Sequence, residues 1–323
     1  RPPRSTLFPY TTLFRSAALR AFVEAGFRLF QLDLFLEECW TKEGPVSVDL
    51  ARKQIRGVLD LCPGAAVVLR WHVNAPPWWR EAHPEELTRY ANGDFEQPER
   101  TQPVRPLQDD LRRTPRASLA SELWYEDARA KTVELLRGLE KTEEGQALAG
   151  IHVACGVYGE WHYWGFMRNE PDVCAPMQKR FAEWRKTRGK AAAPVPGVEE
   201  RKALDEGIFR DPRRREAVID YYRCQQELVA ERILGLCETV KQNWPRPLLT
   251  GTFYGYFFSM FDRQATGGHL CVQQVLESKH VDYLSAPQAY GTAFRDPGGS
   301  GISRALVDSV RRNGKLFLDE MDQ

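Results

Sequence analysis

From Ala17 onward, short apolar runs alternate with longer amphipathic stretches. This alternation is typical of βα units built around a parallel sheet. Six runs have the composition and length of buried strands: GFRLFQLDL from Gly26, AAVVLRWHV from Ala65, GIHVACGVY from Gly150, PLLTGTFY from Pro247, VDYLSAP from Val281 and KLFLDEM from Lys315. The last three begin at equal intervals of about one βα unit, and this regularity favours a barrel.

Helical periodicity fills the stretches between these runs. The pattern predicts three helices, over residues 124–139, 177–188 and 213–243. Two gaps are longer than one βα unit requires, so we expect insertions at about 92–120 and 165–211. The first insertion is polar and rich in arginine, and the second contains the small-residue linker GKAAAPVPG. Because long loops after strands usually line a site, both insertions are expected near the functional end of the fold.

Composition narrows the class of protein. Among 323 residues, 42% are hydrophobic, and 45 Lys and Arg against 44 Asp and Glu leave a net charge of +1. Such a balance predicts no nucleic-acid or anionic-membrane partner, and no apolar run approaches the ~20 residues that a membrane span needs. The seven cysteines show no C-x-x-C pairing, so we expect reduced core residues. The sequence implies no metal site and no cofactor.

The first sixteen residues differ from the rest. RPPRSTLFPYTTLFRS contains two near-copies of one unit, STLFPY and TTLFRS, and no apolar period continues from it into the chain that follows. It resembles the translation of a sequencing adapter. We therefore expect residues 1–16 to contribute nothing to the core, and residues 17–323 to form one partial catalytic domain.

An acidic residue among aromatic rings follows the third run. In a parallel barrel the functional groups lie at the C-terminal ends of the strands, so the last residues of each strand and those that follow it are the candidates. The segment GVYGEWHYWG places Glu160 among Tyr158, Trp161, Tyr163 and Trp164. Desolvation by such rings raises the pKa of a carboxyl group toward the value that a general acid needs. The alternative is a surface Glu beside a structural tryptophan cluster.

The sixth run ends in further carboxylates. LFLDEMD offers Asp319, Glu320 and Asp322. Strand alternation points Asp319 and Glu320 to opposite faces, so at most one of that pair faces the mouth of the barrel, and the residues alone do not choose between them. Glycoside hydrolysis requires two carboxyl groups, one to protonate the leaving oxygen and one to attack the anomeric carbon or activate water.

The second run continues into WHVNAPPWWREAHPEEL. Two prolines stop the strand, which leaves Trp78 and Trp79 at its mouth, where an indole face can stack on a pyranose. Asn74 supplies an amide that can bond sugar hydroxyls. The alternative for the tryptophans is a packed barrel rim, and His72 is expected to be a core histidine.

Three segments resemble one group of enzymes. NAPPWWREAHPEEL is similar to the N-x-P-P-W-W...H-P-E segment of family 42 β-galactosidases and related clan A glycoside hydrolases. GIHVACGVYGEWHYWG resembles the strand-four acid/base segment of β-galactosidase-like proteins, and VDYLSAPQAYG, PGGSG and GKLFLDEMD resemble their strand-six and strand-seven ends. The resemblance implies a (β/α)8 TIM barrel with strands two to seven visible. It also implies a retaining glycoside hydrolase that cleaves a β-linked, galactoside-like sugar.

The resemblance assigns roles by position. Glu160 corresponds to the acid/base and Glu320 to the nucleophile, and Tyr290 falls where these enzymes place a tyrosine that bonds the nucleophile. Most clan members have Asn before the acid/base, where it holds the 2-hydroxyl of the sugar, whereas this chain has Gly159. The expected substrate-binding residues are Asn74, Trp78, Trp79, Tyr158, Trp161, Trp164, Tyr290 and Arg295.

The sequence is also compatible with two rival functions. One is a carbohydrate-binding barrel without turnover, which would hold Glu320 in an ion pair away from the mouth. The other is a different barrel chemistry, such as a metal-dependent hydrolase, but the six histidines do not fall at the required strand ends. Because strands one and eight would lie outside this sequence, we expect the protein to continue beyond Gln323 and this piece alone to be inactive. No feature of the sequence indicates a compartment or an oligomeric state.

Overall fold

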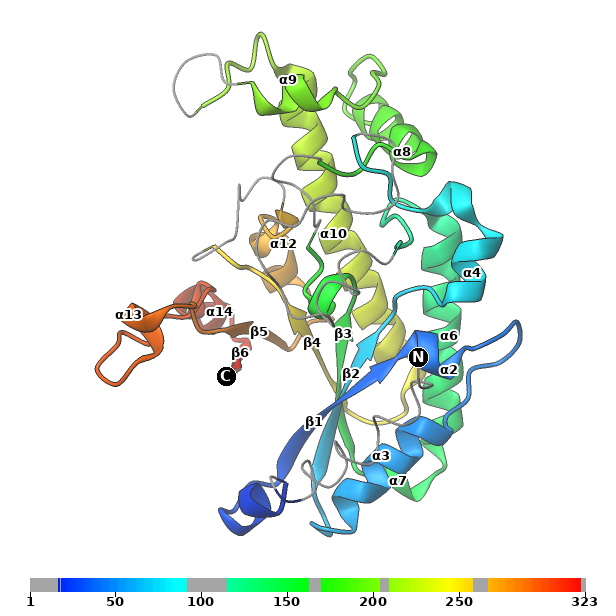
Figure 1. The fold of residues 1–323 in the computed structure, drawn as a ribbon, viewed down its shortest axis with the longest axis vertical. Helices are drawn as coiled ribbons and strands as arrows, with labels where there is room; N and C mark the ends of the chain where they lie inside the picture. The colour runs from blue at the N-terminus through cyan, green and yellow to red at the C-terminus, as the bar shows by residue number, and fades with distance from the viewer. Residues whose placement is uncertain are drawn as a thin grey trace, which may run out of the picture.

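The computed structural model describes residues 17, 19–91, 115–162, 170–203, 209–257 and 267–320, and Figure 1 shows its fold. All strands in this part of the chain belong to one parallel sheet with the order β1-β2-β3-β4-β5-β6. The strands are β1 Leu29–Phe35, β2 Ala66–His72, β3 Leu148–Ala154, β4 Leu249–Phe253, β5 Tyr283–Pro287 and β6 Leu316–Glu320. Each coincides with one predicted run, which confirms the six strands.

The three long helices predicted from periodicity are confirmed as α6 Glu122–Glu140, α8 Ala175–Lys186 and α10 Glu216–Asn243. Shorter elements complete the units: α2 Leu36–Cys39, α3 Asp49–Leu59, α4 Pro77–Ala82, η2 Pro84–Glu86, α7 Glu143–Gln146, η3 Val157–Gly159, α9 Val198–Lys202, α12 Val272–Glu277, α13 Thr292–Arg295 and α14 Val307–Arg312. Helices α8 and α9 lie in the second expected insertion. Most of the first insertion and all of residues 1–16 lie outside the described residues.

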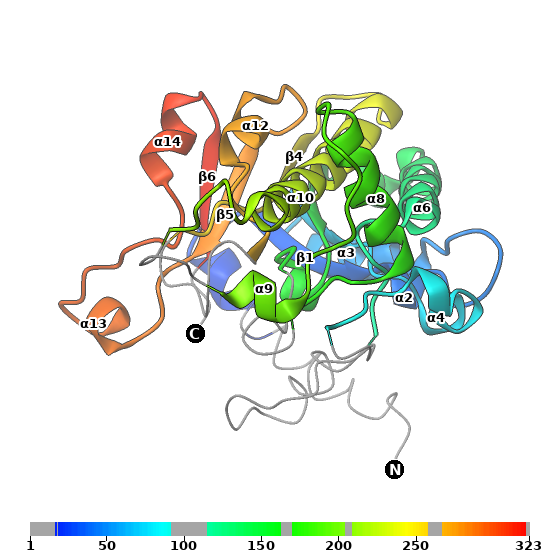
Figure 2. The same ribbon diagram turned by 90° about the horizontal axis from the view of Figure 1, so that it is seen from above.

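The helices cover one face of the sheet. Figure 2 shows α6, α10, α12 and α14 side by side along that face, with the strands inside them. The apolar stripe of α10 packs there, and Leu228, Ile233 and Leu236 are fully buried. The inner strands are buried on both faces because helices cover one side and the curled sheet encloses the other, as β5 illustrates with five buried residues in a row.

A single ion pair shows that the sheet is curled. Arg70 Nη2 on β2 lies 2.6 Å from Glu320 Oε1 on β6, although three strands separate β2 from β6. In a flat sheet these two strands would be roughly 19 Å apart. The six strands therefore form a half-barrel whose concave face brings β2 and β6 together. Closure into eight strands stays a prediction.

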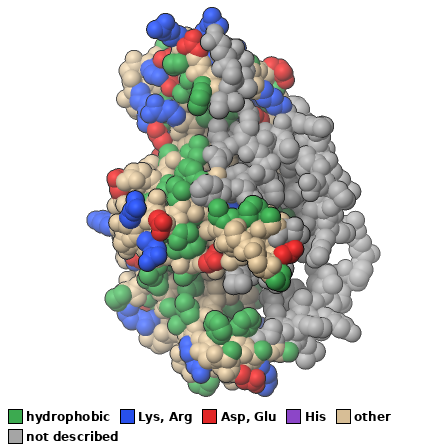
Figure 3. All heavy atoms as spheres, turned by 90° about the vertical axis from the view of Figure 1, so that its left-hand side faces the viewer, with side chains coloured by type: hydrophobic (Ala, Val, Ile, Leu, Met, Phe, Trp, Pro, Cys, Tyr) green, Lys and Arg blue, Asp and Glu red, His purple; other side chains and the backbone are tan. Residues whose placement is uncertain are grey.

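The surface carries charges of both signs. On the face in Figure 3, Lys and Arg side chains alternate with Asp, Glu and apolar side chains over the described part, without a continuous basic field. No helix within the described ranges is long and apolar enough to cross a bilayer. All seven cysteines are free thiols, and six of them are buried, as the sequence predicted.

Candidate active site

A tight turn after β3 presents Glu160. Four of its residues have left-handed backbone angles: Gly156 (φ 79°), Tyr158 (φ 57°), Gly159 (φ 79°) and Trp161 (φ 60°). Such angles are unfavourable for Tyr and Trp, and strained backbone of this kind is concentrated at functional sites. The turn closes where Trp161 N donates to Cys155 O at 2.9 Å. It fixes the carboxyl group of Glu160 at the C-terminal end of the sheet.

The Glu160 side chain is only 9% exposed and is held between two different neighbours. Its Oε1 lies 3.8 Å from Arg304 Nη1, and its Oε2 lies 3.7 Å from His162 Nε2. Its backbone carbonyl accepts a hydrogen bond of 2.6 Å from His269 Nε2. One oxygen therefore faces a cation and the other faces an imidazole ring.

Tyr256, in the segment after β4, links the two candidate carboxylates. It is fully buried, and burial raises the pKa of its phenol well above the ordinary value. The negative charges of Glu160 and Glu320 raise this pKa further, while Arg304 lowers it. The phenol therefore lies within electrostatic reach of both carboxylates.

Glu320 lies at the end of β6 on the concave face. Its side chain is 28% exposed and forms the 2.6 Å ion pair with Arg70. Arg70 also lies 3.5 Å from Asp33 Oδ1 on β1. Asp319 is exposed and accepts a hydrogen bond from Gln288 Nε2 at 3.1 Å. Strand alternation therefore separates the two adjacent acidic residues, as expected, and turns Glu320 toward Arg70.

A series of neighbouring guanidinium groups and aromatic rings connects Glu320 to Glu160. The Arg70 guanidinium lies 4.5 Å from the centre of the Phe253 ring, and Phe253 lies 6.5 Å from the Tyr256 ring. Arg304, which faces Glu160, lies 4.4 Å from the centre of the Tyr256 ring. These contacts connect the surroundings of the two carboxylates, which both lie toward the C-terminal edge of the sheet.

His72 occupies the space beside Gly159. A Cβ atom added to Gly159 would lie 2.8 Å from His72 Cε1 and 2.8 Å from Ala154 Cβ. His72 Nε2 bonds Asp33 Oδ1 at 3.1 Å, and its ring stacks on Phe35. His72 is the buried, bonded histidine that the sequence predicted, and its position leaves no room for an Asn side chain at residue 159.

Asn74 braces the Glu160 turn. Its Nδ2 donates to Gly156 O at 3.1 Å, and its Oδ1 accepts from Gly156 N at 2.8 Å. The Cys155 thiol also contacts Oδ1. Both ends of the amide are bonded to the Gly156 backbone, so Asn74 stabilises the turn that carries Glu160.

The tryptophans that the sequence predicts as sugar contacts differ in their exposure to solvent. Trp79 and Trp161 are each 1% exposed, and their Nε1 atoms donate to Asp127 Oδ2 at 2.7 Å and Thr252 Oγ1 at 2.9 Å. Neither indole has an open face for a sugar. Trp78 is half-buried, packs edge-on against Trp40 and donates to its carbonyl oxygen at 2.9 Å.

The other described residues of the prediction lie in the loop after β5 and in the Glu160 turn. Tyr290 is 36% exposed, with Arg295 at 4.1 Å and Arg304 at 5.5 Å from its ring centre. Arg295 also bonds the carbonyls of residues 288 and 289. Tyr158 is half-buried within the turn. Trp164, together with Tyr163 and Asp322, lies outside the described residues.

Sequence reasoning missed several residues of this site. Arg70 had a readable signal, because a charged residue within an apolar strand run requires a partner. His162 is two residues from Glu160, and Tyr256 comes two residues after the predicted run that begins at Pro247, so their position alone made them candidates. Arg304 and His269 come from loops with no distinguishing pattern, and only the fold brings them to Glu160.

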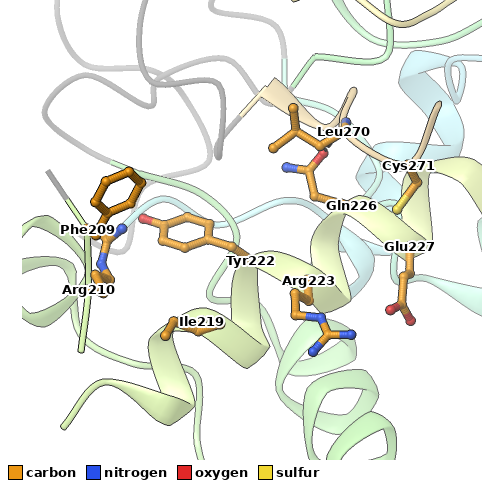
Figure 4. Close-up of a pocket in the computed structure, with 9 residues that line it drawn as sticks. All are labelled: Phe209, Arg210, Ile219, Tyr222, Arg223, Gln226, Glu227, Leu270 and Cys271. Atoms are coloured by element: carbon orange, nitrogen blue, oxygen red, sulfur yellow. Dashed lines mark hydrogen bonds between the residues drawn. The ribbon is translucent and has the colours of Figure 1, made fainter. Parts of the chain in front are cut away.

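A separate pocket of about 520 Å³ lies beside the N-terminal half of α10. Figure 4 shows Tyr222, Arg223 and Gln226 of α10 with Leu270 and Phe209 around it. Leu270, which lines the pocket, directly follows His269 of the candidate site. Among all the described residues, no three His, Cys, Asp or Glu side chains are grouped so that they could hold a metal ion.

Comparison with known proteins gives a fold and no family. No family model matches the chain, and no curated protein sequence matches it. The catalytic domain of β-amylase from Paenibacillus polymyxa is similar in structure, with a TM-score of 0.60 at 11% sequence identity. That similarity covers 95% of this chain and 82% of the β-amylase domain.

Two β-galactosidases are also similar. The enzyme from the psychrophilic Marinomonas ef1 has a TM-score of 0.56 at 13% identity, and the enzyme from Bacillus circulans sp. alkalophilus has 0.55 at 15%. The similarity covers 87% and 89% of this chain but only 40% and 38% of those proteins. The chain thus has the α/β-barrel type of fold seen in these glycoside hydrolases, over less than half of the galactosidases' length.

Proposed function

We propose that this chain carries the active site of a retaining glycoside hydrolase for a β-linked, galactoside-like sugar. The observation that carries the proposal is the pair Glu160 and Glu320, held in different environments at the C-terminal edge of a half-barrel. Paired carboxyl groups with unlike surroundings are the arrangement that acid/base and nucleophilic roles require. The structural likeness to glycoside hydrolases supports the same class.

In the first step, Glu320 attacks the anomeric carbon while Glu160 gives its proton to the leaving glycosidic oxygen. The C–O bond to the leaving group breaks, and a covalent bond forms between the sugar and a carboxylate oxygen of Glu320. Arg70 holds the attacking carboxylate in place through its 2.6 Å contact. The carboxylate therefore has little orientational entropy left to lose in the transition state.

In the second step, water attacks the same anomeric carbon. Glu160, now ionised, takes a proton from that water, and the bond between the sugar and Glu320 breaks. Arg304, 3.8 Å from Glu160, stabilises the carboxylate during this half of the cycle. The products are the free sugar with its original anomeric configuration and the regenerated enzyme.

Sugar contacts are assigned to the groups that the structure leaves accessible. Tyr290 offers an exposed ring on the sixth loop, and Trp78 offers a half-buried indole near the end of β2. These two, with Tyr158, take the place of Trp79 and Trp161, which are enclosed. Trp164 lies outside the described residues and stays a proposed contact.

Covalent trapping tests this proposal. The full-length gene product is incubated with an activated 2-deoxy-2-fluoro-β-galactoside, and its peptides are analysed by mass spectrometry. We expect a fluorosugar adduct on Glu320, and proton NMR of a normal substrate should show the β-anomer first. Inversion of the anomer without an adduct would replace retention by a single displacement.

A non-catalytic sugar-binding barrel is the competing function. It would hold Glu320 away from the mouth, but the ion pair with Arg70 keeps this carboxylate on the concave face. Sugar binding measured by calorimetry with no turnover of any aryl glycoside would favour this competing function.

A further inference from the structure

Two histidines stack beside Glu160 that the proposed mechanism does not use. The rings of His162 and His269 lie 4.3 Å apart at an angle of 16°, and Tyr254 stacks on the other side of His269 at 4.8 Å. His162 and His269 are buried. They come from two segments, the turn after β3 and residues 267–270, which meet only in the folded chain.

Backbone carbonyls determine the tautomer of each ring. His162 Nδ1 lies 3.1 Å from Gly267 O, and His269 Nε2 lies 2.6 Å from Glu160 O. A carbonyl oxygen only accepts, so each of these nitrogens carries the proton. His269 Nδ1 in turn accepts from Tyr256 N at 3.3 Å. A neutral His162 therefore presents an unprotonated Nε2, and this is the atom that lies 3.7 Å from Glu160 Oε2.

The surroundings keep His162 neutral. Burial lowers its pKa to about 3, and the nearby positive charge of Arg304 also lowers it. The Gly267 carbonyl has the opposite effect, and the Tyr256 ring packs edge-on at 5.4 Å. His269, on the stacked face, has its own pKa lowered well below the usual value. Over the working range of an enzyme, His162 thus remains an acceptor.

We propose that His162 is a positioning residue that holds the proton of Glu160 on Oε2. This inference rests on the proposed function, in which Glu160 must start protonated. A lone pair facing Oε2 stabilises the carboxylic acid and disfavours the carboxylate, whereas Arg304 near Oε1 favours the carboxylate. The phenol of Tyr256 also interacts with Glu160, and as a donor it favours the carboxylate as Arg304 does. The two oxygens therefore have opposite preferences, which suits a group that gives a proton in one step and takes one in the next.

The test removes the lone pair of His162 Nε2 and keeps an aromatic ring stacked on His269. In the full-length protein, His162→Phe retains a ring against His269 but has no lone pair for Glu160. We expect the basic limb of kcat/KM against pH, measured with a poor leaving group, to move down by about one pH unit, because the lone pair 3.7 Å from Oε2 that favours the acid is lost. Tyr254→Phe is the matched control, because it alters the same stack without facing the carboxyl group, and its limb should not move.

A second measurement separates this inference from the proposed function. The carboxyl signal of Glu160, assigned in ¹³C-glutamate-labelled protein by its loss in Glu160→Gln, is titrated in parent and variants. Its midpoint should fall by about one pH unit in His162→Phe, and His162→Leu gives the same comparison if the Phe variant does not fold. An unmoved midpoint overturns the role of His162. Absence of turnover in the parent overturns the hydrolase proposal, while the titration still decides the inference.

Discussion

Glu160 and Glu320 sit at the ends of two strands of one sheet, yet their surroundings differ. Glu160 is almost enclosed, with a cation at 3.8 Å and a neutral imidazole at 3.7 Å. Glu320 is partly open to solvent and makes a direct 2.6 Å ion pair with Arg70. Near-complete enclosure with the guanidinium held at 3.8 Å suits a group that must carry a proton, whereas a guanidinium in direct contact suits a group that must act as an anion.

The difference arises from local backbone. Glu320 extends from a regular strand, so alternation alone directs it to the concave face beside β2. Glu160 leaves its strand through a turn with four left-handed residues, which buries it under the loops that follow β4 and β5. A strand end therefore presents an accessible carboxylate, whereas a strained turn can place one in a desolvated position.

Removing each carboxyl group should give the largest effects and should separate the two roles. Glu320→Ala is expected to lower kcat at least about 10⁴-fold with every substrate, because the nucleophile is lost. Glu160→Ala should lose about 10²–10⁴-fold with a poor leaving group but much less with dinitrophenyl glycosides in the first step. Steady-state kinetics with both substrates, and azide added to restore Glu160→Ala, measures this difference. Equal losses in both variants on the dinitrophenyl substrate would contradict the assigned roles.

The turn that creates the enclosed site should tolerate little change. Gly159→Asn restores the residue typical of the resembling enzymes, yet its Cβ would meet His72 and Ala154 at 2.8 Å with φ at 79°. We expect the free energy of unfolding to fall by about 2–4 kcal/mol from left-handed strain and overpacking. Chemical denaturation measures it, with Gly189→Asn as the control, since that glycine is left-handed and open. Equal losses at both positions would show that His72 is not the obstacle.

How much the sequence could predict follows from these same residues. The six strands and three long helices were readable because burial imposes their apolar periods. Glu160 was readable as a candidate because it follows a strand end, whereas the end of the sixth run offered both Asp319 and Glu320 and only the resemblance selected Glu320. The enclosure of Trp79 was not, because its partner Asp127 comes from α6 and only packing brings the two together. Arg304 and His269 were equally hidden, since loop positions leave no period in a sequence.

The Arg70 ion pair can be removed to test whether direct contact with a guanidinium is what orients Glu320. Arg70→Met keeps the aliphatic packing against Phe253 and removes the charge. We expect a loss of about 1–3 kcal/mol in the free energy of unfolding, discounted for the partial exposure of both groups, and a lower kcat. Arg70→Lys, which keeps the charge without the planar fork, should lie between parent and Arg70→Met. A kcat equal to that of the parent in Arg70→Met would mean that Arg70 does not orient Glu320.

At pH 7 the smallest effect should come from His152, which is fully buried on β3 and pairs in register with Arg70 of β2. Burial lowers its pKa well below the usual value, and the charge of Arg70 lowers it further. Below about pH 6.5 the unfolded chain therefore binds a proton that the folded chain does not, so stability is lost as the pH falls. For one such group the free energy of unfolding falls by up to about 1.4 kcal/mol for each pH unit.

His152→Leu should remove that share of the acid sensitivity while keeping an apolar side chain against Phe253 and Tyr283. Within the part of the chain that the structure describes, neither ring nitrogen of His152 has a hydrogen-bond partner, so the variant should be as stable as the parent at pH 7. Urea unfolding of both proteins at several values between pH 4.5 and 7 measures the difference, in which the titration of the carboxyl groups cancels. Parallel curves would mean that His152 is already charged in the folded protein, and Arg70 would then face a second cation while it neutralises Glu320.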